Sequence, residues 1–323
     1  MRTKWFFNGI SLSALVALLL VCASSVAQDV QQNSAGDADP EAGPQVEPNA
    51  EQTRVVGQSG LQGRPKWEFG VGGGFFEGFD YPGSLDSNRR QFGLPFFIYR
   101  SKRFRFGGGG LSAVTIEKPR FRLDWSVAAS LNASTQENSV REGLPDLDFL
   151  LELGPQLIWR AVDTTLNDGT QIRLDWSTKL RGVVSTDFGS VAGQGFVFET
   201  TVSGRLRNFL DQRRVVLFGA LSARAGTEQL NDYFYEVDPQ FSTATRPAFD
   251  ARGGLIDLQA TVGVGLNLPK RVRIFIATTT GFFAAAANRE SPLHEALSTT
   301  SFALGVVWTI KQSKARVGVL ETK

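Results

Sequence analysis

The sequence contains very few of the residues that most often carry chemistry, with one cysteine, one methionine and one histidine among 323 residues. Cys22 and Met1 both lie before residue 28, in a segment that we expect to be removed on export. The mature chain then has no thiol, which excludes disulfides, thiolate metal sites and a cysteine nucleophile. Because His294 is the single histidine, a metal centre built from several histidines is excluded too.

An excess of charge of one sign is also missing, since 34 Lys and Arg face 32 Asp and Glu. The net charge of +2 comes from Arg2 and Lys4 in the first four residues. Without them 32 residues of each sign remain. Such a balanced chain has no basic field for nucleic acid.

Residues 1–27 form a predicted signal peptide. Arg2 and Lys4 give a basic start, Leu12 to Val21 an apolar run, and Ser25-Val26-Ala27 a small-residue cleavage site. The apolar run is shorter than the roughly 20 residues that a membrane-spanning helix needs. A lipoprotein signal at Cys22 is the alternative, but Val21 stands where such signals normally have a small residue. We expect export, with the mature chain beginning at Gln28.

Residues 28–65 are expected to form a disordered acidic linker. The segment has six acidic residues, four prolines and no aromatic residue. It cannot bury enough apolar surface to offset the entropy lost on ordering.

From Trp67 onward the sequence alternates between apolar and polar residues, which is the period of a β-strand. In residues 172–181, Ile, Leu, Trp, Thr and Leu alternate with Arg, Asp, Ser, Lys and Arg. The same alternation occurs in 121–132 and 196–207. Further strands are predicted near 66–76, 91–100, 103–116, 146–161, 213–226, 255–268, 271–284 and 299–310.

The predicted strands are too long for a typical β-sandwich, whose strands average about five or six residues. Strands of roughly 9 to 11 residues, apolar on one face and charged on the other, fit a tilted crossing of a bilayer. Glycines inside the strand patterns permit tight curvature. We therefore predict an all-β fold, a transmembrane antiparallel β-barrel over residues 66–310, with about 12 strands, or 10 as the fallback, and a basic C-terminal tail over 311–323.

A five-residue motif occurs twice in the sequence, each time in a predicted strand and with the same facing. Arg122-Leu123-Asp124-Trp125-Ser126 recurs as Arg173-Leu174-Asp175-Trp176-Ser177. Either a β unit is duplicated, or two membrane strands converged on Trp outside and charges inside, and we favour convergence. Asp124 and Asp175 are expected to pair with inward Arg or Lys rather than to act in catalysis.

Several ordered motifs resemble those of the MipA/OmpV outer-membrane proteins over residues 67–310. They are, in chain order, Asp80 to Ser84 (DYPGS), Leu94 to Arg100 (LPFFIYR), Glu142 to Asp148 (EGLPDLD), Tyr233 to Val237 (YFYEV), Ala251 to Gly254 (ARGG) and Ser291 to Leu293 (SPL). The resemblance implies an outer-membrane β-barrel of a Gram-negative bacterium. For the family namesake it implies a scaffold that holds a murein lytic transglycosylase near a penicillin-binding protein.

The chain departs from the family pattern at two places. Pro145 stands where the family more often has Gly, a change that a turn absorbs. Family members also tend to end on an aromatic residue, whereas thirteen residues follow Ile310 here. The form of the C-terminal assembly signal is thus in question, and Lys311, Lys314 and Arg316 make the added tail basic.

Barrel enzymes often use a histidine with a serine or an acid, and His294 with Ser291 and Glu295 is the one such combination that the sequence offers. Its setting in a predicted loop beside Pro292 favours an exposed loop histidine without a catalytic role. We predict no catalytic, cofactor-binding or metal-binding residues.

Three other features have structural interpretations. Tyr81-Pro82-Gly83 predicts a tight turn, and partner binding by Tyr81 is the weaker alternative. The glycine run 107–110 is no phosphate loop, because no Gly-Lys-Ser/Thr follows. Trp67, Trp159 and Trp308 near strand ends predict an aromatic girdle at the membrane interface.

The sequence thus favours a non-enzymatic outer-membrane scaffold for murein enzymes. The first alternative is a small-solute pore with a modest anion preference, since inward basic residues outnumber acidic ones. The second is an outer-membrane hydrolase that uses His294. The expected inward residues are Arg122, Arg173, Lys179, Arg181, Arg205, Arg207, Arg224, Arg271 and Arg273 against Asp124, Asp148, Glu152, Asp175, Glu199 and Asp257.

Overall fold

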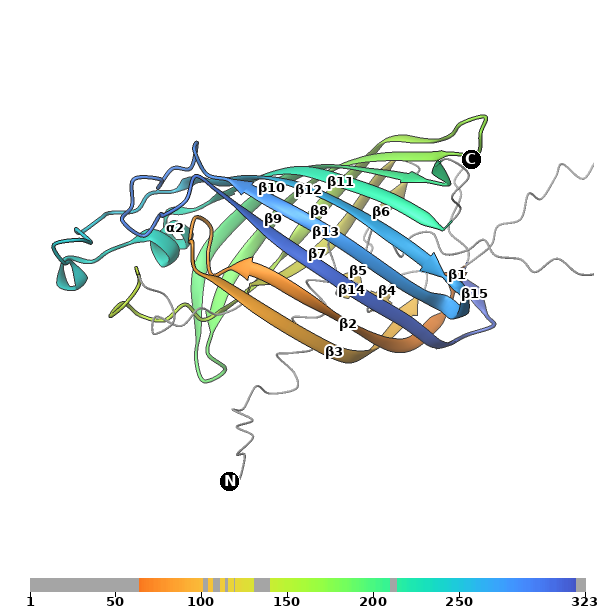
Figure 1. Ribbon diagram of the computed structural model, residues 1–323, viewed down its shortest axis with the longest axis horizontal. Helices are drawn as coiled ribbons and strands as arrows, with labels where there is room; N and C mark the ends of the chain where they lie inside the picture. The colour runs from red at the N-terminus through yellow and green to blue at the C-terminus, as the bar shows by residue number, and fades with distance from the viewer. Residues whose placement is uncertain are drawn as a thin grey trace, which may run out of the picture.

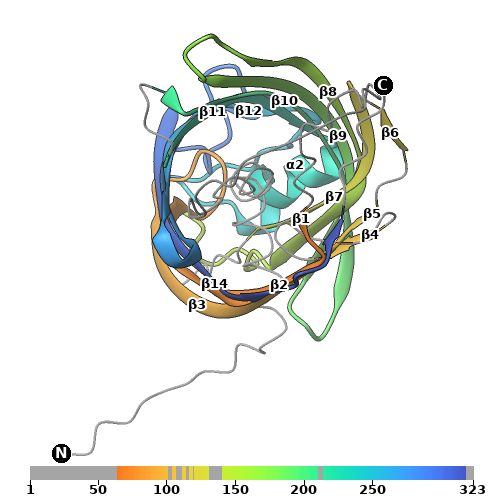
Figure 2. The same cartoon turned by 90° about the vertical axis from the view of Figure 1, so that its right-hand side faces the viewer.

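The computed structural model describes residues 64–100, 104–106, 111–113, 116–118, 120–130, 140–209 and 214–317. The predicted signal peptide and the linker up to residue 63 lie outside these residues. Within them, a 13-stranded antiparallel sheet curls into a barrel-shaped ring, with the short helix α2 inside its outline (Figure 2).

Ten strands of this sheet have ten or more residues. These ten strands include the segments 121–130 and 172–181, whose alternation is that of a half-buried strand. They are β2 (Trp67–Phe79), β3 (Ser87–Arg100), β7 (Phe121–Ser130), β8 (Phe149–Thr165), β9 (Gln171–Thr186), β10 (Val191–Arg207), β11 (Val215–Gly226), β12 (Gly254–Leu268), β13 (Val272–Phe282) and β14 (Ser298–Gln312).

The long strands follow one another as a meander (Figure 1). Each pairs with its sequence neighbour from β7 to β14, and β14 then pairs with β2. Three short strands, β4 (Phe104–Phe106), β5 (Leu111–Ala113) and β6 (Ile116–Lys118), complete the order. The hydrogen-bonded ladder of the described residues ends at β5 on one side and at β6 on the other, so it does not run all the way round.

The two faces of the sheet have the predicted chemistry. On β9, Trp176 and Leu180 are 47% and 50% exposed on the outside, whereas Arg181 is 4% exposed inside. On β7, Trp125 points outward while Asp124 and Ser126 are buried. The outer face is apolar and the inner face is polar and charged, which confirms the predicted facing.

Two predictions about strands need correction. Residues 103–116 do not form one strand, because Phe104 pairs with Ala113 in an antiparallel β4–β5 hairpin. Glycines weaken a strand and favour reversal of the chain, and four of them lie between the paired segments. The predicted count of twelve strands is not confirmed, since ten long strands and three short ones are described.

The first and last described segments meet at one end of the sheet. β1 (Arg64–Pro65) pairs with β15 (Arg316–Val317). The Ser313 hydroxyl accepts a hydrogen bond from Lys66 N at 2.8 Å and donates one to Ala315 O at 2.6 Å. Residues that the sequence assigned to the linker and the tail therefore join the two ends of the barrel segment, and β14 continues to Gln312.

Strands β8 and β9 approach each other closely at Gly154, where there is no room for a side chain. A Cβ at Gly154 would lie 1.9 Å from the carbonyl oxygen of Leu180 on the neighbouring strand. A larger residue there would force β8 and β9 apart.

The part of the chain that the structure describes contains no helix long and apolar enough to cross a membrane.

Candidate functional site: a loop cluster above a cavity

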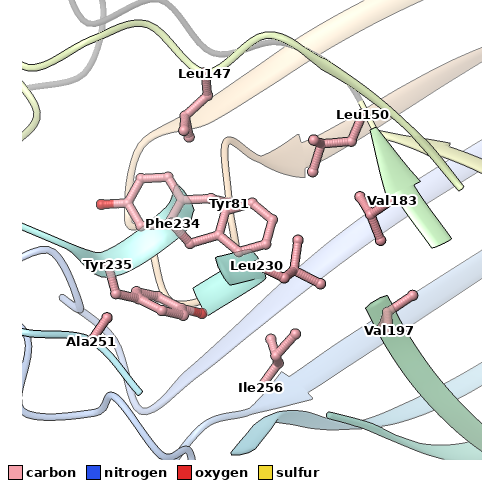
Figure 3. Close-up of a cluster of buried hydrophobic side chains, with 10 residues drawn as sticks. All are labelled: Tyr81, Leu147, Leu150, Val183, Val197, Leu230, Phe234, Tyr235, Ala251 and Ile256. Carbon is pink, nitrogen blue, oxygen red and sulfur yellow. The ribbon is translucent and has the colours of Figure 1, made fainter. Parts of the chain in front are cut away.

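The loops at the end of the sheet opposite β1 and β15 pack against one another, and we call this group the loop cluster. It contains residues 80–86, 140–148, 227–253 and 283–297, which include α2 (Glu228–Tyr235). Its buried apolar side chains pack against those of the adjoining strand ends (Figure 3). They are Tyr81, Leu147, Leu150, Val183, Val197, Leu230, Phe234, Tyr235, Ala251 and Ile256.

Helix α2 forms because its apolar residues share one side and because an acidic residue in its first turn stabilises the N-terminus. Leu230, Phe234 and Tyr235 are buried, while acidic Glu228 occupies the first turn, where it suits the helix dipole. Thr227 precedes the helix, and its hydroxyl accepts a hydrogen bond from Phe196 N at 3.0 Å. This bond ties the start of the helix to β10.

Two buried tyrosines join loops that are far apart in sequence. The Tyr81 hydroxyl donates to Leu293 O at 2.6 Å, and the Tyr235 hydroxyl donates to Pro82 O at 2.9 Å. Burial raises the pKa of both phenols above the usual range, so both remain protonated donors. The predicted turn is present too, since Ser84 N donates to Tyr81 O and Gly83 has a positive φ of 89°.

A buried asparagine pair forms a second joint. Asn288 Nδ2 donates to Asn231 Oδ1 at 2.9 Å and to Arg252 O at 2.8 Å. Asn231 Nδ2 in turn donates to Thr227 O at 3.0 Å. Neither asparagine can be recognised from the sequence, because an isolated asparagine in a loop carries no signal of a pairing 57 residues away.

Arg141 is a third joint that the sequence did not reveal. Its guanidinium donates to Phe234 O at 3.0 Å and to Pro145 O at 3.3 Å. It also lies 5.5 Å from the centre of the Tyr81 ring, within the range of a cation–π contact. Burial lowers the pKa of Arg141, and the carbonyl oxygens and the ring compensate the charge that burial leaves without water.

His294 lies in this cluster but no catalytic group forms around it. The prediction of an exposed histidine was wrong, because the ring is half-buried, 5.9 Å from the Tyr235 ring and 5.5 Å from the Phe283 ring. The Ser291 hydroxyl donates its hydrogen bond to Tyr235 O, and the Glu295 carboxylate accepts one from Leu85 N. Burial lowers the pKa of His294, and its Nε2 has no hydrogen-bond partner in the described residues. A serine, histidine and acid relay is therefore not assembled there.

A cavity of about 280 Å³ lies between the loop cluster and the barrel wall. Aromatic and aliphatic side chains of the cluster line it on one side, and polar residues of the barrel wall line the rest. Its acidic residues include Glu152 and Asp257. Glu152 pairs with Arg181 at 2.8 Å, and Asp257 accepts a hydrogen bond from Arg224 Nε at 3.0 Å.

The inward charges of the barrel wall mostly pair with their neighbours. Arg181 on β9 reaches Glu152 on β8 and Glu199 on β10, and Lys179 lies 2.7 Å from Glu199. In the repeated motif, Asp124 pairs with Arg122 at 2.8 Å. Asp175 pairs with Arg160 at 3.5 Å and with Arg173 at 3.7 Å, so the predicted pairing of both aspartates is confirmed.

One predicted inward residue is misplaced. Arg271 lies exposed in the turn Pro269–Arg271, one residue before β13 begins. Proline interrupts the strand pairing, so the chain turns there before the alternation resumes.

No group of three or more His, Cys, Asp or Glu that could hold a metal ion occurs in the described parts of the chain.

Comparison with known proteins gives one family and a few distant structures. The family model of the MltA-interacting protein MipA matches residues 70–310. No curated protein matches the chain.

The chain is distantly similar to several solved structures, of which three follow. The outer membrane phospholipase A from Escherichia coli is 12% identical over 77% of this chain and 95% of its own, with a TM-score of 0.27. The Pseudomonas putida toluene transporter TodX is 8% identical over 78% and 93%, with a TM-score of 0.30. A Pseudomonas aeruginosa FadL homologue is 9% identical over 76% and 90%, with a TM-score of 0.22. At these TM-scores the likenesses carry no inference about function.

Proposed function

Since this chain belongs to the MltA-interacting protein MipA family, we propose that it is an outer-membrane β-barrel that docks murein-processing enzymes. The proposed partners are a murein lytic transglycosylase and a penicillin-binding protein. The family name itself refers to binding of a protein rather than to a reaction.

The membrane location rests on the outer face of the sheet. Its exposed residues are large and apolar on strand after strand, for example Phe198, Leu221 and Val262, which are 44%, 66% and 63% exposed. A water-soluble protein rarely exposes so extensive an apolar surface, whereas a barrel in lipid requires one. Trp159 and Trp308 lie toward the end that carries β1 and β15, as girdle residues would, and each is 46% exposed.

The non-enzymatic role rests on how the loop cluster is organised. Its buried polar side chains are used to hold loops together, as Tyr81, Tyr235 and Ser291 do through backbone carbonyl oxygens. A nucleophile, a base and an orienting group must lie within hydrogen-bond reach of one another for catalysis. The group around His294 does not meet that requirement, so docking is the function that the geometry supports best.

The docking face is assigned to the end where β1 and β15 meet. Among the residues whose exposure the structure describes, this end carries eight exposed basic side chains, which we call the basic rim, against the exposed acids Asp163 and Asp168. An acidic surface of a periplasmic partner would be attracted to it. The rim consists of Lys66, Lys118, Arg120, Arg214, Lys270, Arg271, Lys311 and Lys314.

The docking test is affinity purification of the tagged full chain from detergent-solubilised envelopes. A Lys311→Glu, Lys314→Glu double variant should recover less transglycosylase and penicillin-binding protein, and the loss should shrink as salt rises. Arg289→Glu is the matched control, because Arg289 is exposed in a loop at the opposite end. If the unaltered chain recovers neither enzyme, the scaffold is wrong; if the double variant recovers both normally, the rim is not the docking face.

The location is tested separately by membrane fractionation and intact-mass measurement. We expect the protein in the outer membrane with Gln28 as its first residue. A soluble periplasmic product would contradict the barrel, and a diacylglyceryl mass on Cys22 would support the lipoprotein alternative.

A further inference from the structure

The charges that line the cavity below the loop cluster do not balance locally. Four acidic and two basic side chains line it, namely Asp80, Asp148, Glu152 and Asp257 with Arg90 and Arg224. Glu152 and Asp257 are neutralised by arginines, as described above, and Asp80 accepts a hydrogen bond from Asn88. Arg90 is itself engaged by another group of the protein.

Asp148 is the exception among the acids. Its backbone carbonyl accepts a hydrogen bond from the Tyr233 hydroxyl at 3.1 Å, but no described residue pairs with its carboxylate. Burial raises the pKa of this carboxyl, and the nearby carboxylates of Asp187 and Asp146 raise it further. A cation beside Asp148 would relieve both effects.

The remaining lining of the cavity suits the rest of such a cation. Six aromatic rings line it, and the negative face of an aromatic ring attracts an ammonium group. They are Phe76, Phe79, Tyr81, Tyr233, Phe234 and Phe283. A volume of about 280 Å³ lies at the small end of ligand pockets, which selects a small molecule.

We propose that the cavity binds a small organic cation, a primary or quaternary ammonium compound. Asp148 is its counter-ion, and the aromatic rings surround its apolar groups. The site is separate from the basic rim, at the opposite end of the sheet, and stands whether or not the rim docks an enzyme.

The test uses the purified full chain in a maltoside detergent, so that no choline headgroup competes. Titration calorimetry should detect binding of choline, and the neutral isostere 3,3-dimethylbutan-1-ol should bind at least about tenfold more weakly. Asp148→Asn should weaken choline binding by a similar factor. Asp148→Glu keeps the charge and should retain most of it.

Two further variants separate the site from general damage. Asp168→Asn removes an exposed carboxylate at the other end of the barrel and should leave choline binding unchanged. Phe76→Leu removes one aromatic ring from the lining and should weaken it. Heat-modifiable mobility on gels reports that each variant is folded. Equal affinity for choline and its neutral isostere, unchanged affinity in Asp148→Asn, or no binding at millimolar choline would each overturn the proposal.

Discussion

Single tyrosine hydroxyl groups link loops that are far apart in the sequence of this protein. The bond from Tyr81 to Leu293 spans 212 residues of sequence, and Tyr81 is 3% exposed. Tyr81→Phe keeps the ring but leaves the buried carbonyl oxygen of Leu293 without its donor. We expect a loss of about 1 to 3 kcal/mol in the free energy of unfolding, because an unsatisfied buried acceptor is costly.

Urea unfolding followed by tyrosine and tryptophan fluorescence measures that change. Tyr99→Phe is the matched control, since Tyr99 lies exposed on β3. A Tyr81→Phe protein as stable as the Tyr99→Phe protein would show that the buried bond contributes little.

We expect Asp232 on α2 to make the stability of the loop cluster depend on pH. Burial raises its pKa from the ordinary 3.8 to about 6, and Glu236, Glu228 and Asp250 add to the shift. Between these two values the folded state holds the proton more tightly than the unfolded state, so stability falls as pH rises through this window. Asp232→Asn should remove this dependence and strengthen the cluster at neutral pH, modestly because the group is partly exposed.

Hydrogen-exchange protection of α2 at pH 4.5 and 7.5 would report the effect. Asp168 supplies a contrast of opposite sign, because hydrogen bonds from Thr170 lower its pKa. That turn should instead weaken as the pH falls below 3.8, and it should keep the same protection at pH 4.5 and 7.5. A protection of α2 that is the same at both pH values in the unaltered chain would contradict the role of Asp232.

At the scale of elements, the facing of β9 gives a direct test of the membrane assignment. Leu180 points outward and is 50% exposed. Leu180→Arg should cost about 2 to 4 kcal/mol if the site lies near the middle of the bilayer, because the charge then meets hydrocarbon. Ser177→Arg, on the polar inner face of the same strand, should cost far less.

The folded fraction in lipid vesicles, read from heat-modifiable mobility, compares the two variants. Equal tolerance of arginine at both positions would argue against a lipid-facing row on β9.

The strands were predictable because each one carries its own evidence. The alternation around Trp176 or Trp125 gives both strand and facing within ten residues. Residues 103–116 misled for the same reason, since apolar spacing does not show that Phe104 and Ala113 pair with each other.

The loop cluster was only half predictable. Five of the six motifs that carried the family resemblance, those around Tyr81, Leu144, Tyr235, Ala251 and Leu293, meet in it. Nothing local says that they meet, because the meander topology brings them together rather than any property of the segments. Arg141 and Asn288 show the limit, since their partners lie 93 and 57 residues away.

For the whole molecule, we expect the loop cluster to decide whether the barrel conducts ions. Helix α2 lies inside the outline of the sheet, and the inward charges pair along the wall (Figure 2). We expect almost no ion current from the unaltered protein in planar bilayers. Replacing residues 228–252 with a short Gly-Ser linker should open a path and raise the conductance at least about tenfold, with a modest preference for anions.

A variant with the same linker in place of the exposed residues 242–245 is the control, since that segment lies outside the buried network. A large, stable conductance of the unaltered chain, with no enzyme recovered from envelopes, would favour the pore over the scaffold.

The pairing of β14 with β2 also sets the order in which the barrel is built. Its contacts, such as Leu304 with Phe75, join the last long strand to the first. This seam cannot form until the whole chain has been delivered to the membrane. Until then the growing sheet has two open edges, which are prone to pair with other chains. The wait is long because contacts distant in sequence form slowly. We therefore expect this architecture to fold faster, and with less mispairing, when another factor shields the first edge until the last strand arrives.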